Sequence, residues 1–488
     1  MRILMISAEA APFAKTGGLA DAVSALSKAL CRLGHDVKVL LPRYYQIDRS
    51  RLTLCKKNVL VSTGWSEIPV HFYCRPGTFG DDADYYFVDY ERLFGRTGIY
   101  GNDFEGDFRD NPLRFSMLCR SAFALCRALG WSPDVFHSHD WSVALVPVLL
   151  SHFERAAFPA AVSVLSIHNM GYQGRFPGGA FPLLGLHEEL RSRARLDFLG
   201  GINFLQAGII AADKICTVSA RYAVEIQTEG GGFGLDGLMR IVSHNLHGIV
   251  NGVDTELWNP SKDTYLPARF SSQDMSGKAV CKAVLQKRFD LPQNEDVPVV
   301  CLISRLADQK GISELFAPNY GALYRLCTEL NAQFIVIGSG ERWCQDELRS
   351  LSSRLPNLAC YIGYDEELSH LAEAGADYFL MPSKYEPCGL NQMYSMLYGT
   401  LPVVHATGGL MDTVFQYDEG AQTGTGFLFY DLTPDAIFNT VRWALTLFPQ
   451  KKKLFAMRRR AMEQDFSWKK AAEAYCSVYE DALSRRNG

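Results

Sequence analysis

Several features that mark other classes of protein are missing from this sequence of 488 residues. No apolar run is long enough to cross a bilayer, and the N-terminus lacks the charged-then-apolar layout of a signal peptide. The cysteine count is 13, an odd number, and no two cysteines are spaced C-x-x-C, which argues against disulfides and against a zinc site. We therefore expect a cytoplasmic protein with no membrane partner, whose cysteines are reduced core residues.

A strong excess of charge of one sign is also missing. The formal net charge is −4, and charged residues make up 21% of the chain against 48% hydrophobic residues. These values are ordinary for a soluble protein and give no reason to expect a nucleic-acid partner. The length exceeds what one hydrophobic core holds, so the chain is expected to fold as two or three domains.

The first feature that the sequence does contain is a glycine loop behind an N-terminal strand. Residues 1–7 (MRILMIS) are expected to form a buried strand, and helical periodicity runs over residues 22–32. Between them, Gly17 and Gly18 let the backbone approach a phosphate, and Lys15 adds a positive charge. The loop lacks both the Walker pattern and G-x-G-x-x-G, so a glycine turn with a solvated lysine is the alternative interpretation.

Strands and helices continue to alternate along the chain, which predicts an α/β fold of two doubly wound, Rossmann-like domains. Hairpins are expected in residues 60–90, and a flexible glycine loop is expected in residues 229–236. The predicted domains are residues 1–246 and 247–462. Residues 463–488 are expected to cross back to the first domain as a helix.

Three histidines stand near predicted strand ends in the first half of the chain. His137 and His139 lie at alternate positions of one strand, and His168 directly follows another, residues 162–167. Alternate histidines can bind a metal, but no cysteine is placed to complete such a site. A histidine at the carboxyl end of a strand is placed to meet a ligand. The alternative is a histidine that only hydrogen-bonds a neighbouring loop.

The most informative stretch is residues 383–413, which follows a short apolar run ending in proline. Glu386 lies in a turn before a predicted helix, and Thr407, Gly408 and Gly409 form a turn after a predicted strand. Such turns at the carboxyl ends of parallel strands can hold sugar hydroxyls and phosphates. The alternative interpretation is an ordinary core βαβ unit with a surface glutamate.

Two cations, Arg305 and Lys310, follow the predicted strand of residues 299–304 on one loop. They form either a solvated basic loop or, together with Lys15, a site for a diphosphate. Since both domains carry ligand turns, we expect a deep cleft between them. These residues suit a nucleotide-diphosphate sugar, because the cations neutralise the diphosphate and Glu386 contacts the sugar without need of a metal.

The chain resembles the bacterial glycogen synthase and plant starch synthase family along essentially its whole length. The matching motifs occur in order and are highly specific in combination: KTGGL at 15–19, HSHDW at 137–141, HN at 168–169, NGVD at 251–254, Arg305 with Lys310, EPCGL at 386–390, YGT at 398–400, TGG at 407–409 and DFSW at 465–468. The resemblance implies the GT-B fold and no cofactor. It also implies transfer of glucose from ADP-glucose to the non-reducing 4-hydroxyl of an α-1,4-glucan such as glycogen, with retention of anomeric configuration.

The resemblance implies roles for individual residues as well. Glu386 resembles the essential carboxylate beside the donor glucose, while Arg305 and Lys310 resemble the pair that neutralises the leaving diphosphate. His168 resembles the histidine at the sugar's 6-position, with His139 as the second choice for that role. The other implied substrate contacts are Lys15, Gly18, Asp21, Asp110, Asn251, Cys388, Gly389, Leu390, Thr407, Gly408 and Gly409.

Three positions depart from the family pattern. Gln206 and Lys384 stand where the family usually has lysine and arginine, and Asn391 stands where it usually has threonine. Lys384 keeps the positive charge but lacks the planar guanidinium fork. These departures bear on acceptor affinity or on the base of the donor, which leaves UDP-glucose as an alternative donor.

Two rival functions belong to different classes. A glycogen phosphorylase has a similar two-domain fold but binds pyridoxal phosphate covalently through a lysine. The bound cofactor would give the purified protein a yellow absorbance. The length of this chain and its Lys15 loop argue against that enzyme. A glucan-binding protein on an inactive transferase scaffold is the other rival. The presence of Lys15, Arg305, Lys310 and Glu386 together argues against it.

Overall fold

The computed structural model of the chain describes residues 1–64, 66–78, 80–102, 104–318 and 320–487. The chain packs into two compact units: unit 1 is residues 1–252 with 468–488, and unit 2 is residues 253–467. The chain passes from one unit to the other twice, after Gly252 and after Ser467. A hydrogen bond joins these two segments: the Val253 amide donates to the Phe466 carbonyl at 2.8 Å.

Unit 1 is built on one sheet, in which nine strands of the described residues take the order β14-β13-β9-β8-β1-β2-β5-β4-β3. The neighbours are parallel except for β4, which runs antiparallel to β3 and β5 and confirms the hairpins expected in residues 60–90. Successive parallel strands are added outward from β1, first on one side and then on the other. The order therefore reverses between β1 and β8, where doubly wound sheets bind ligands. The strands are β1 Arg2–Ile6, β2 Asp36–Pro42, β3 Thr53–Ser62, β4 Glu67–Arg75, β5 Asp84–Asp89, β8 Val135–His139, β9 Val162–Ile167, β13 Lys214–Thr217 and β14 Leu246–Gly248.

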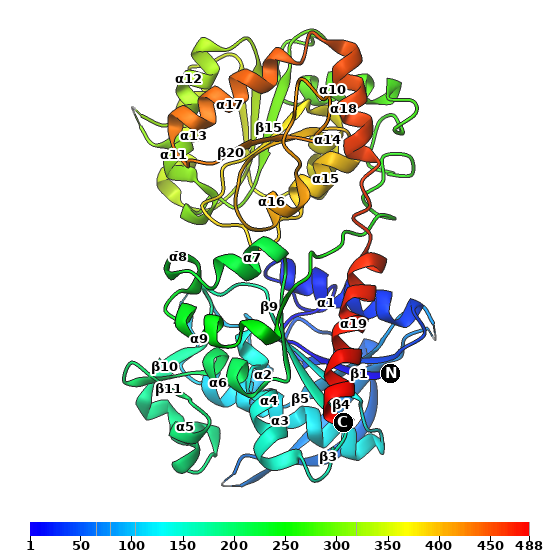
Figure 1. Ribbon diagram of the computed structural model, residues 1–488, viewed down its shortest axis with the longest axis vertical. Coiled ribbons are helices and arrows are strands. Elements are labelled where there is room, and N and C mark those ends of the chain that lie inside the picture. The colour runs from blue at the N-terminus through cyan, green and yellow to red at the C-terminus, as the bar shows by residue number, and fades with distance from the viewer. Residues whose placement is uncertain (65, 79, 103, 319, 488) are drawn as a thin grey trace. The chain divides into compact units, whose positions relative to one another are not determined.

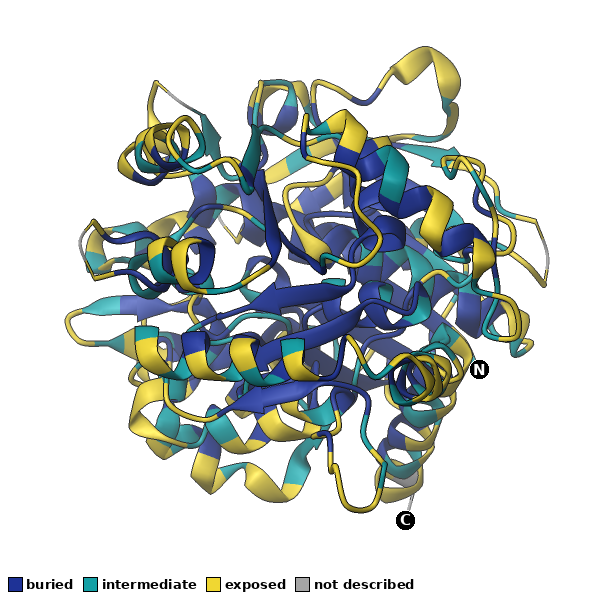
Figure 2. Ribbon diagram, turned by 90° about the horizontal axis from the view of Figure 1, so that it is seen from above, coloured by how far each residue is buried: buried dark blue, intermediate teal, exposed yellow. Residues whose placement is uncertain are grey.

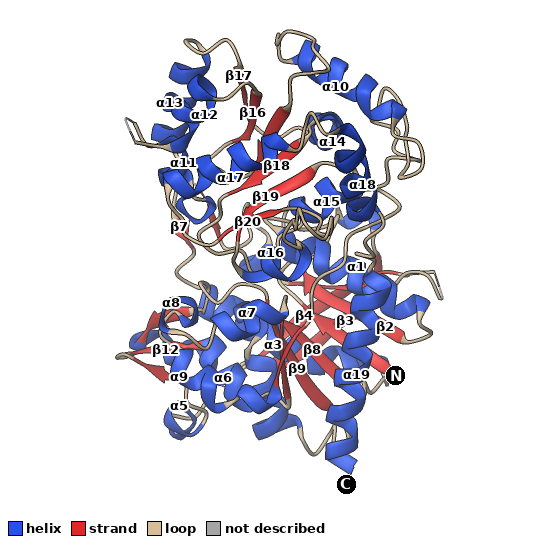
Figure 3. Ribbon diagram, turned by 45° about the horizontal axis from the view of Figure 1, so that its top comes forward, coloured by secondary structure: helices blue, strands red, loops and turns tan. Residues whose placement is uncertain are grey.

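Helices surround this sheet, and its central strands are buried, whereas the edge strand β3 and the outer helix faces are exposed (Figures 2 and 3). The final helix packs on α1 and β9 of the same unit (Figure 1). Helix α1 begins at Gly18, four residues before the predicted start at 22, so Gly18 to Asp21 form its first turn. The helices are α1 Gly18–Arg32, α2 Glu91–Phe94, α3 Asn111–Leu129, α4 Leu145–Leu149, α5 Glu189–Arg193, α6 Phe204–Ala211, α7 Ala220–Glu225, α8 Glu229–Gly232, α9 Asp236–Ile241 and α19 Trp468–Asn487.

Two features of unit 1 differ from the sequence prediction. The expected flexible loop at 229–236 is wrong, because α8 occupies its first residues and α9 begins at its last. The Thr228 hydroxyl accepts a hydrogen bond from the Gly231 amide at 3.3 Å, and this cap stabilises a helix that glycine alone disfavours. Short antiparallel strands were also not predicted: β6 Gly101–Asn102 with β7 Gly106–Asp107, and β10 Arg175–Pro177 with β12 Gly201–Asn203 and β11 Asp197–Phe198.

Unit 2 is built on a second sheet, whose six strands in the described residues are all parallel and take the order β17-β16-β15-β18-β19-β20. This is the 3-2-1-4-5-6 order of a Rossmann fold, and it reverses between β15 and β18. The strands are near-continuous apolar runs because helices cover both faces of such a sheet. They are β15 Val299–Ile303, β16 Gln333–Gly338, β17 Leu358–Ile362, β18 Tyr378–Met381, β19 Leu401–His405 and β20 Phe427–Phe429.

The helices of unit 2 alternate with these strands, as the sequence predicted for an α/β domain. The predicted glycine turn at 407–409 is partly wrong, since Gly408 already begins a helix. The helices are α10 Ser276–Arg288, α11 Ile312–Phe316, α12 Ala322–Glu329, α13 Arg342–Ser352, α14 Glu366–Gly375, α15 Asn391–Leu397, α16 Gly408–Thr413, α17 Pro434–Thr446 and α18 Lys451–Met462.

Two further observations bear on the sequence predictions. All thirteen cysteines lie in the described part of the chain, and all are free thiols that are buried or half-buried. Among the described residues, no helix is both long enough and apolar enough to span a membrane.

Candidate active site

The candidate site of unit 2 lies where the sheet order reverses, at the loops that follow β15 and β18. The Lys384 amide donates to the Gln309 carbonyl at 2.8 Å, and the Gln309 side chain donates to the Tyr385 carbonyl at 3.2 Å. Gly311 has φ +71°, and a Cβ at this position would lie 1.8 Å from the Pro382 carbonyl oxygen. Only glycine therefore allows the two loops to approach so closely.

Glu386 is the central side chain of this site. It is only 7% exposed, and its Oε2 forms an ion pair with Lys310 Nζ. The Ser383 hydroxyl donates to the same oxygen at 3.0 Å. Within the described residues Oε1 has no hydrogen-bond partner, so the carboxylate is held through one oxygen and offers the other to a ligand.

The two predicted cations of the loop after β15 differ in their surroundings. Lys310 is half-buried and held by Glu386, whereas Arg305 is exposed. Its guanidinium forms no hydrogen bond or ion pair with any residue that the structure describes. Arg305 thus has all its donors available for an anion, and Lys310 can contact an anion while it remains beside Glu386.

The backbone around Glu386 is fixed by the turn after β19. The Gly409 amide donates to the Glu386 carbonyl at 3.0 Å. Gly408 has φ +45°, and a Cβ there would lie 2.0 Å from the same carbonyl oxygen. Thr407 is buried at the N-cap of α16, which places it with these glycines next to Glu386.

Cys388, Gly389 and Leu390 connect Glu386 to α15. The Gln392 side chain donates to the carbonyls of Cys388 and Gly389 at 3.1 and 3.0 Å, and Leu390 is the N-cap of the helix. These two bonds hold the turn between Glu386 and α15. The contacts of Cys388, Gly389 and Leu390 with a substrate remain a prediction.

Sequence reasoning missed two residues that support Glu386. These are Ser383, which donates to the carboxylate, and His405, whose Nδ1 lies 2.7 Å from the Ser383 carbonyl. Ser383 could have been found from its place three residues before the predicted acid on the same turn. His405 could not, because only the parallel pairing of β18 with β19 brings it there.

The candidate site of unit 1 lies at the loop after β1, beside the reversal point of that sheet. Lys15 forms an exposed ion pair with Asp21 at 2.8 Å, and Gly18 is the first residue of α1. Glu9, which sequence reasoning missed, is 3% exposed and accepts hydrogen bonds from the Thr16 amide at 2.5 Å and from the Thr16 hydroxyl at 2.8 Å. This buried acid fixes the glycine loop at a helix N-terminus, which is a favourable place for an anion.

Two further predicted contacts of unit 1 lie outside that loop. Asp110 occupies the N-cap of α3, but its side chain does not cap the helix and instead pairs with Arg96. Asn251 is 8% exposed, and it lies two residues before the start of unit 2. The structure does not bring either residue to the glycine loop through a hydrogen bond within the described part of the chain, so their roles remain predictions.

The histidines of β8 and the residue after β9 form one packed cluster. His139 Nδ1 lies 3.1 Å from His168 Nε2, and the rings of His137 and His139 have centroids 4.0 Å apart. His137 also hydrogen-bonds the Tyr479 hydroxyl of α19 at 2.8 Å. Asp140 accepts from the His168 amide at 2.7 Å and so fixes the backbone of that residue.

Burial keeps this cluster uncharged. It lowers the pKa of His137 to about 3 and that of His168 to about 4, and it lowers the pKa of His139 well below its usual value. Burial also raises the pKa of the Asp140 carboxyl to about 7. The three imidazoles are therefore neutral at neutral pH, and each carries a single N–H.

Acidification is expected to destabilise unit 1. Below the usual histidine pKa of about 6.5, the unfolded chain binds protons that the buried histidines do not, so the free energy of unfolding falls as the pH drops toward 4. Asp140 opposes this trend because its raised pKa makes the folded state bind a proton between about pH 4 and pH 7, but it is one group against three. His139→Asn removes one of the three and should reduce the pH dependence by up to about 1.4 kcal/mol per pH unit.

The measurement is hydrogen exchange at the amides of β8 and β9 between pH 6.5 and pH 5. His187→Asn is the matched control, because His187 is an exposed histidine of the same unit. Equal pH dependence in the parent and in His139→Asn would contradict the neutral cluster.

The three departures from the family pattern all have structural contacts. The Gln206 side chain donates to the Arg195 and Asp197 carbonyls at 2.6 and 2.9 Å, which ties α6 to the small sheet. Lys384 pairs with Asp308 at 2.6 Å, and the Asn391 side chain donates to the Ile303 carbonyl at 2.8 Å. The Asn391 bond joins α15 to the end of β15, so this departure supports the site rather than disrupting it.

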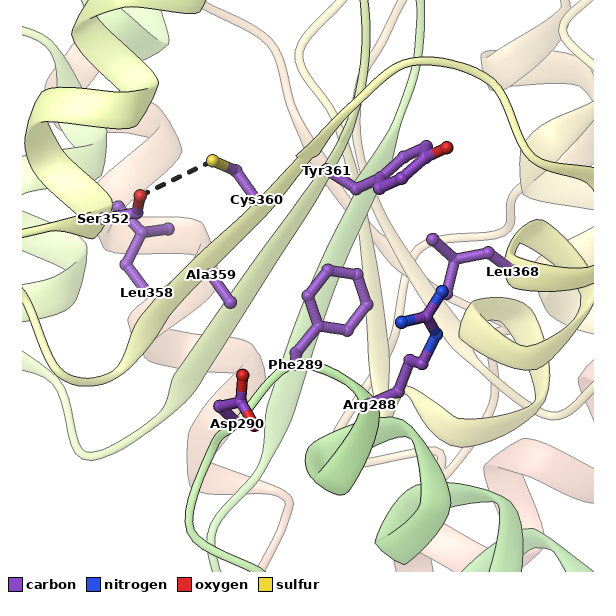
Figure 4. A pocket seen from close by; sticks show the side chains of 9 residues that line it. All are labelled: Arg288, Phe289, Asp290, Ser352, Leu358, Ala359, Cys360, Tyr361 and Leu368. Atoms are coloured by element: carbon purple, nitrogen blue, oxygen red, sulfur yellow. Dashed lines mark hydrogen bonds between the residues drawn. The ribbon is translucent and has the colours of Figure 1, made fainter.

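A cavity of about 330 Å³ lies elsewhere in unit 2, at the edge strand β17 (Figure 4). Strands β16 and β15 separate β17 from the reversal point of the sheet. The cavity offers one cation and one acid rather than a site for a diphosphate, so we do not place the donor there. Its lining residues are Arg288, Phe289, Asp290, Ser352, Leu358, Ala359, Cys360, Tyr361 and Leu368.

Two family descriptions match the two units. The starch synthase catalytic domain matches residues 2–241, and the glycosyl transferases group 1 family matches residues 284–461. A sucrose-phosphate synthase of Thermosynechococcus elongatus shares the fold, with a TM-score of 0.61 at 17% identity over 99% of each chain. Together with the two Rossmann-like units, the two family matches define a glycosyltransferase of the GT-B class.

More similar proteins identify the family. The chain is 50% identical to the glycogen synthase of Treponema denticola over 488 residues, which covers 100% of this chain and 99% of that one. It is 42% identical to glycogen synthase 1 of Geobacter metallireducens, which covers 100% and 97%. The catalytic domain of starch synthase IV from Arabidopsis thaliana, bound to ADP and acarbose, superposes with a TM-score of 0.88 at 32% identity over 99% of each chain. The chain belongs to the family of bacterial glycogen synthases and plant starch synthases, and it is a glucosyltransferase.

Proposed function

We propose that this enzyme transfers the glucosyl group of ADP-glucose to the 4-hydroxyl at the non-reducing end of an α-1,4-glucan such as glycogen. The bond from the anomeric carbon to the diphosphate breaks, and a bond from that carbon to the acceptor oxygen forms with the same anomeric configuration. The proton of the acceptor hydroxyl ends on the released ADP. The observation that carries the proposal is the Lys310–Glu386–Ser383 cluster at the reversal point of unit 2, with the unpaired Arg305 on the same loop.

The charges of this cluster suit a diphosphate leaving group. Negative charge develops on the diphosphate oxygen as its bond to the anomeric carbon breaks. Fixed cations that face this oxygen lower the activation barrier. Arg305 has free donors for the diphosphate, and Lys310 is positioned by Glu386 to stand between the carboxylate and the anion. We assign Thr407, Gly408 and Gly409, which form the turn beside Glu386, to further contacts with the donor.

Glu386 is assigned to the donor glucose. The free Oε1 can accept hydrogen bonds from sugar hydroxyls, and the negative charge counters positive charge that develops at the anomeric carbon. His168 is assigned to a hydroxyl of the same sugar, with His139 behind it. We assign further donor contacts to Lys15 and Gly18 of unit 1, where a fixed glycine loop meets a helix N-terminus.

ADP-glucose is the preferred donor in this proposal. Its support is the bound ADP of the starch synthase that is 32% identical over 99% of this chain.

The thirteen free thiols support the cytoplasmic location that the sequence predicts, because reducing compartments keep cysteines unpaired.

One assay tests the donor and the need for a metal together. Glucose incorporation into glycogen is measured with ADP-glucose and with UDP-glucose, each with and without EDTA. We expect ADP-glucose to give the higher kcat/KM, with no loss in EDTA, because the diphosphate meets Arg305 and Lys310 rather than a metal. Among the described residues no three His, Cys, Asp or Glu side chains gather as metal ligands. Higher kcat/KM with UDP-glucose would overturn the donor assignment, and activity that EDTA removes and Mg²⁺ restores would overturn the role given to the cations.

A further inference from the structure

His139 has a place in unit 1 that the chemistry assigned so far does not use. It is the last residue of β8 and is 1% exposed. The ring of His137 lies on one side of it at 4.0 Å between centroids, and His168 lies beyond its Nδ1. The pairing of β8 with β9 fixes this geometry, because it places His139 opposite Ser166, two residues before His168.

The bond between His139 and His168 must be made by one proton. Both rings are neutral at neutral pH, so each has one N–H and one lone pair. His139 Nδ1 faces His168 Nε2 at 3.1 Å, and one of these two atoms donates to the other. The surroundings of the other nitrogen of His139, Nε2, indicate which of the two atoms donates the hydrogen bond.

That other nitrogen, His139 Nε2, is buried and has no hydrogen-bond partner in the described part of the chain. If Nε2 carried the proton, the structure would contain an orphaned buried N–H donor, which is rare and costly in proteins. If Nδ1 carries it, only a lone pair is left unpaired at Nε2. The favoured arrangement therefore has His139 Nδ1–H donating to His168 Nε2.

His168 then has a single possible tautomer. Its Nε2 is an acceptor, so its proton sits on Nδ1, and this nitrogen has no partner among the described residues. His168 as a residue is half-buried, and its backbone amide is held by Asp140 at 2.7 Å. His168 is thus fixed at its backbone and at one ring nitrogen, and only the Nδ1–H group is free.

We propose that His139 is a positioning residue that holds His168 in the Nδ1–H tautomer, so that His168 offers a neutral hydrogen-bond donor to an oxygen of the sugar. The identity of that oxygen as a donor-sugar hydroxyl rests on the proposed function, but the tautomer does not. A neutral N–H group binds a hydroxyl oxygen without adding a positive charge beside the sugar.

The direct test is nitrogen NMR of the full chain labelled with ¹⁵N-histidine, without substrate. The ¹⁵N shifts and the couplings to ring protons distinguish Nδ1–H from Nε2–H, and His168→Asn assigns the signals by removing them. We expect His168 to be the Nδ1–H tautomer in the parent. A parent spectrum with His168 protonated at Nε2 would overturn the proposal, whatever the enzyme transfers.

Two substitutions of His139 separate positioning from packing. Asparagine places an amide N–H near the position of Nδ1 and should keep the His168 tautomer, whereas leucine removes the donor and should let Nε2–H appear. His139→Leu is expected to raise the KM for the donor up to about tenfold, the value of one hydrogen bond, while His139→Asn stays near the parent.

The outcomes distinguish the two proposals. An unchanged His168 tautomer in His139→Leu, or an equal rise of KM in both variants, would reduce His139 to a packing residue and overturn its positioning role. If the spectra behave as expected but no nucleotide sugar supports transfer, the proposed function fails and the tautomer assignment stands.

Discussion

Replacing Glu386 by glutamine is expected to lower kcat by about 10²- to 10³-fold, in the range measured when one group that stabilises a transition state electrostatically is removed. Glutamine has nearly the same shape and can still accept from Ser383, so the turn between β18 and α15 should persist. It lacks the negative charge that counters charge at the anomeric carbon. The KM for the glucan should change little, because the lost interaction is made mainly in the transition state.

The control for this experiment is Glu329→Gln. Glu329 is a surface acid of the same unit that pairs with Arg325 at 3.1 Å, and no role in the site is assigned to it. Its substitution should leave kcat unchanged. If Glu386→Gln is about as active as the parent, Glu386 has no catalytic role and is an ordinary acid of a βαβ unit.

Arg305→Ala and Lys310→Ala should each lower kcat by about 10²-fold or more, because each leaves the departing diphosphate less neutralised. The double variant should lose less than the product of the two single effects, since residues that act on one leaving group are not additive. Lys310→Ala has a second consequence. It leaves the Glu386 carboxylate without its cation, so the turn around Glu386 should show faster amide exchange than in Arg305→Ala.

Arg325→Ala provides the matched control, as a half-buried arginine of unit 2 that pairs with Glu329 and Asp435. It removes the same charge from the unit without touching the site. Fully independent effects of Arg305 and Lys310 would mean that they neutralise different groups.

The sequence could predict the loops of the site because each lies beside a strong local signal. Apolar runs marked β1, β15, β18 and β19, and the turns after them held Lys15, Arg305, Glu386 and Gly408. The order of strands within each sheet could not be read from these runs, because a parallel strand carries no mark of its neighbours. Only the structure shows that the loops after β15 and β18 meet.

Contacts that form only in the folded chain explain most of what sequence reasoning missed. Glu9 resembles any loop acid until its hydrogen bonds to Thr16 are seen. His405 depends on the pairing of β18 with β19, and the His139–His168 contact depends on the register of β8 with β9. The helix at Glu229–Gly232 was missed for a different reason. Its run of glycines predicts a flexible loop, and the N-cap from Thr228 was not taken into account.

The central claim is that the chain extends an α-1,4-glucan with retention. The most direct measurement is proton NMR of the product formed from ADP-glucose and a short maltooligosaccharide, recorded as the reaction proceeds and followed by digestion with β-amylase. We predict a growing α-anomeric signal of a 1,4-linkage at the non-reducing end, and release of the new glucose as part of maltose. A β-anomeric product, free glucose alone, or glucose 1-phosphate made only when inorganic phosphate is present would contradict it.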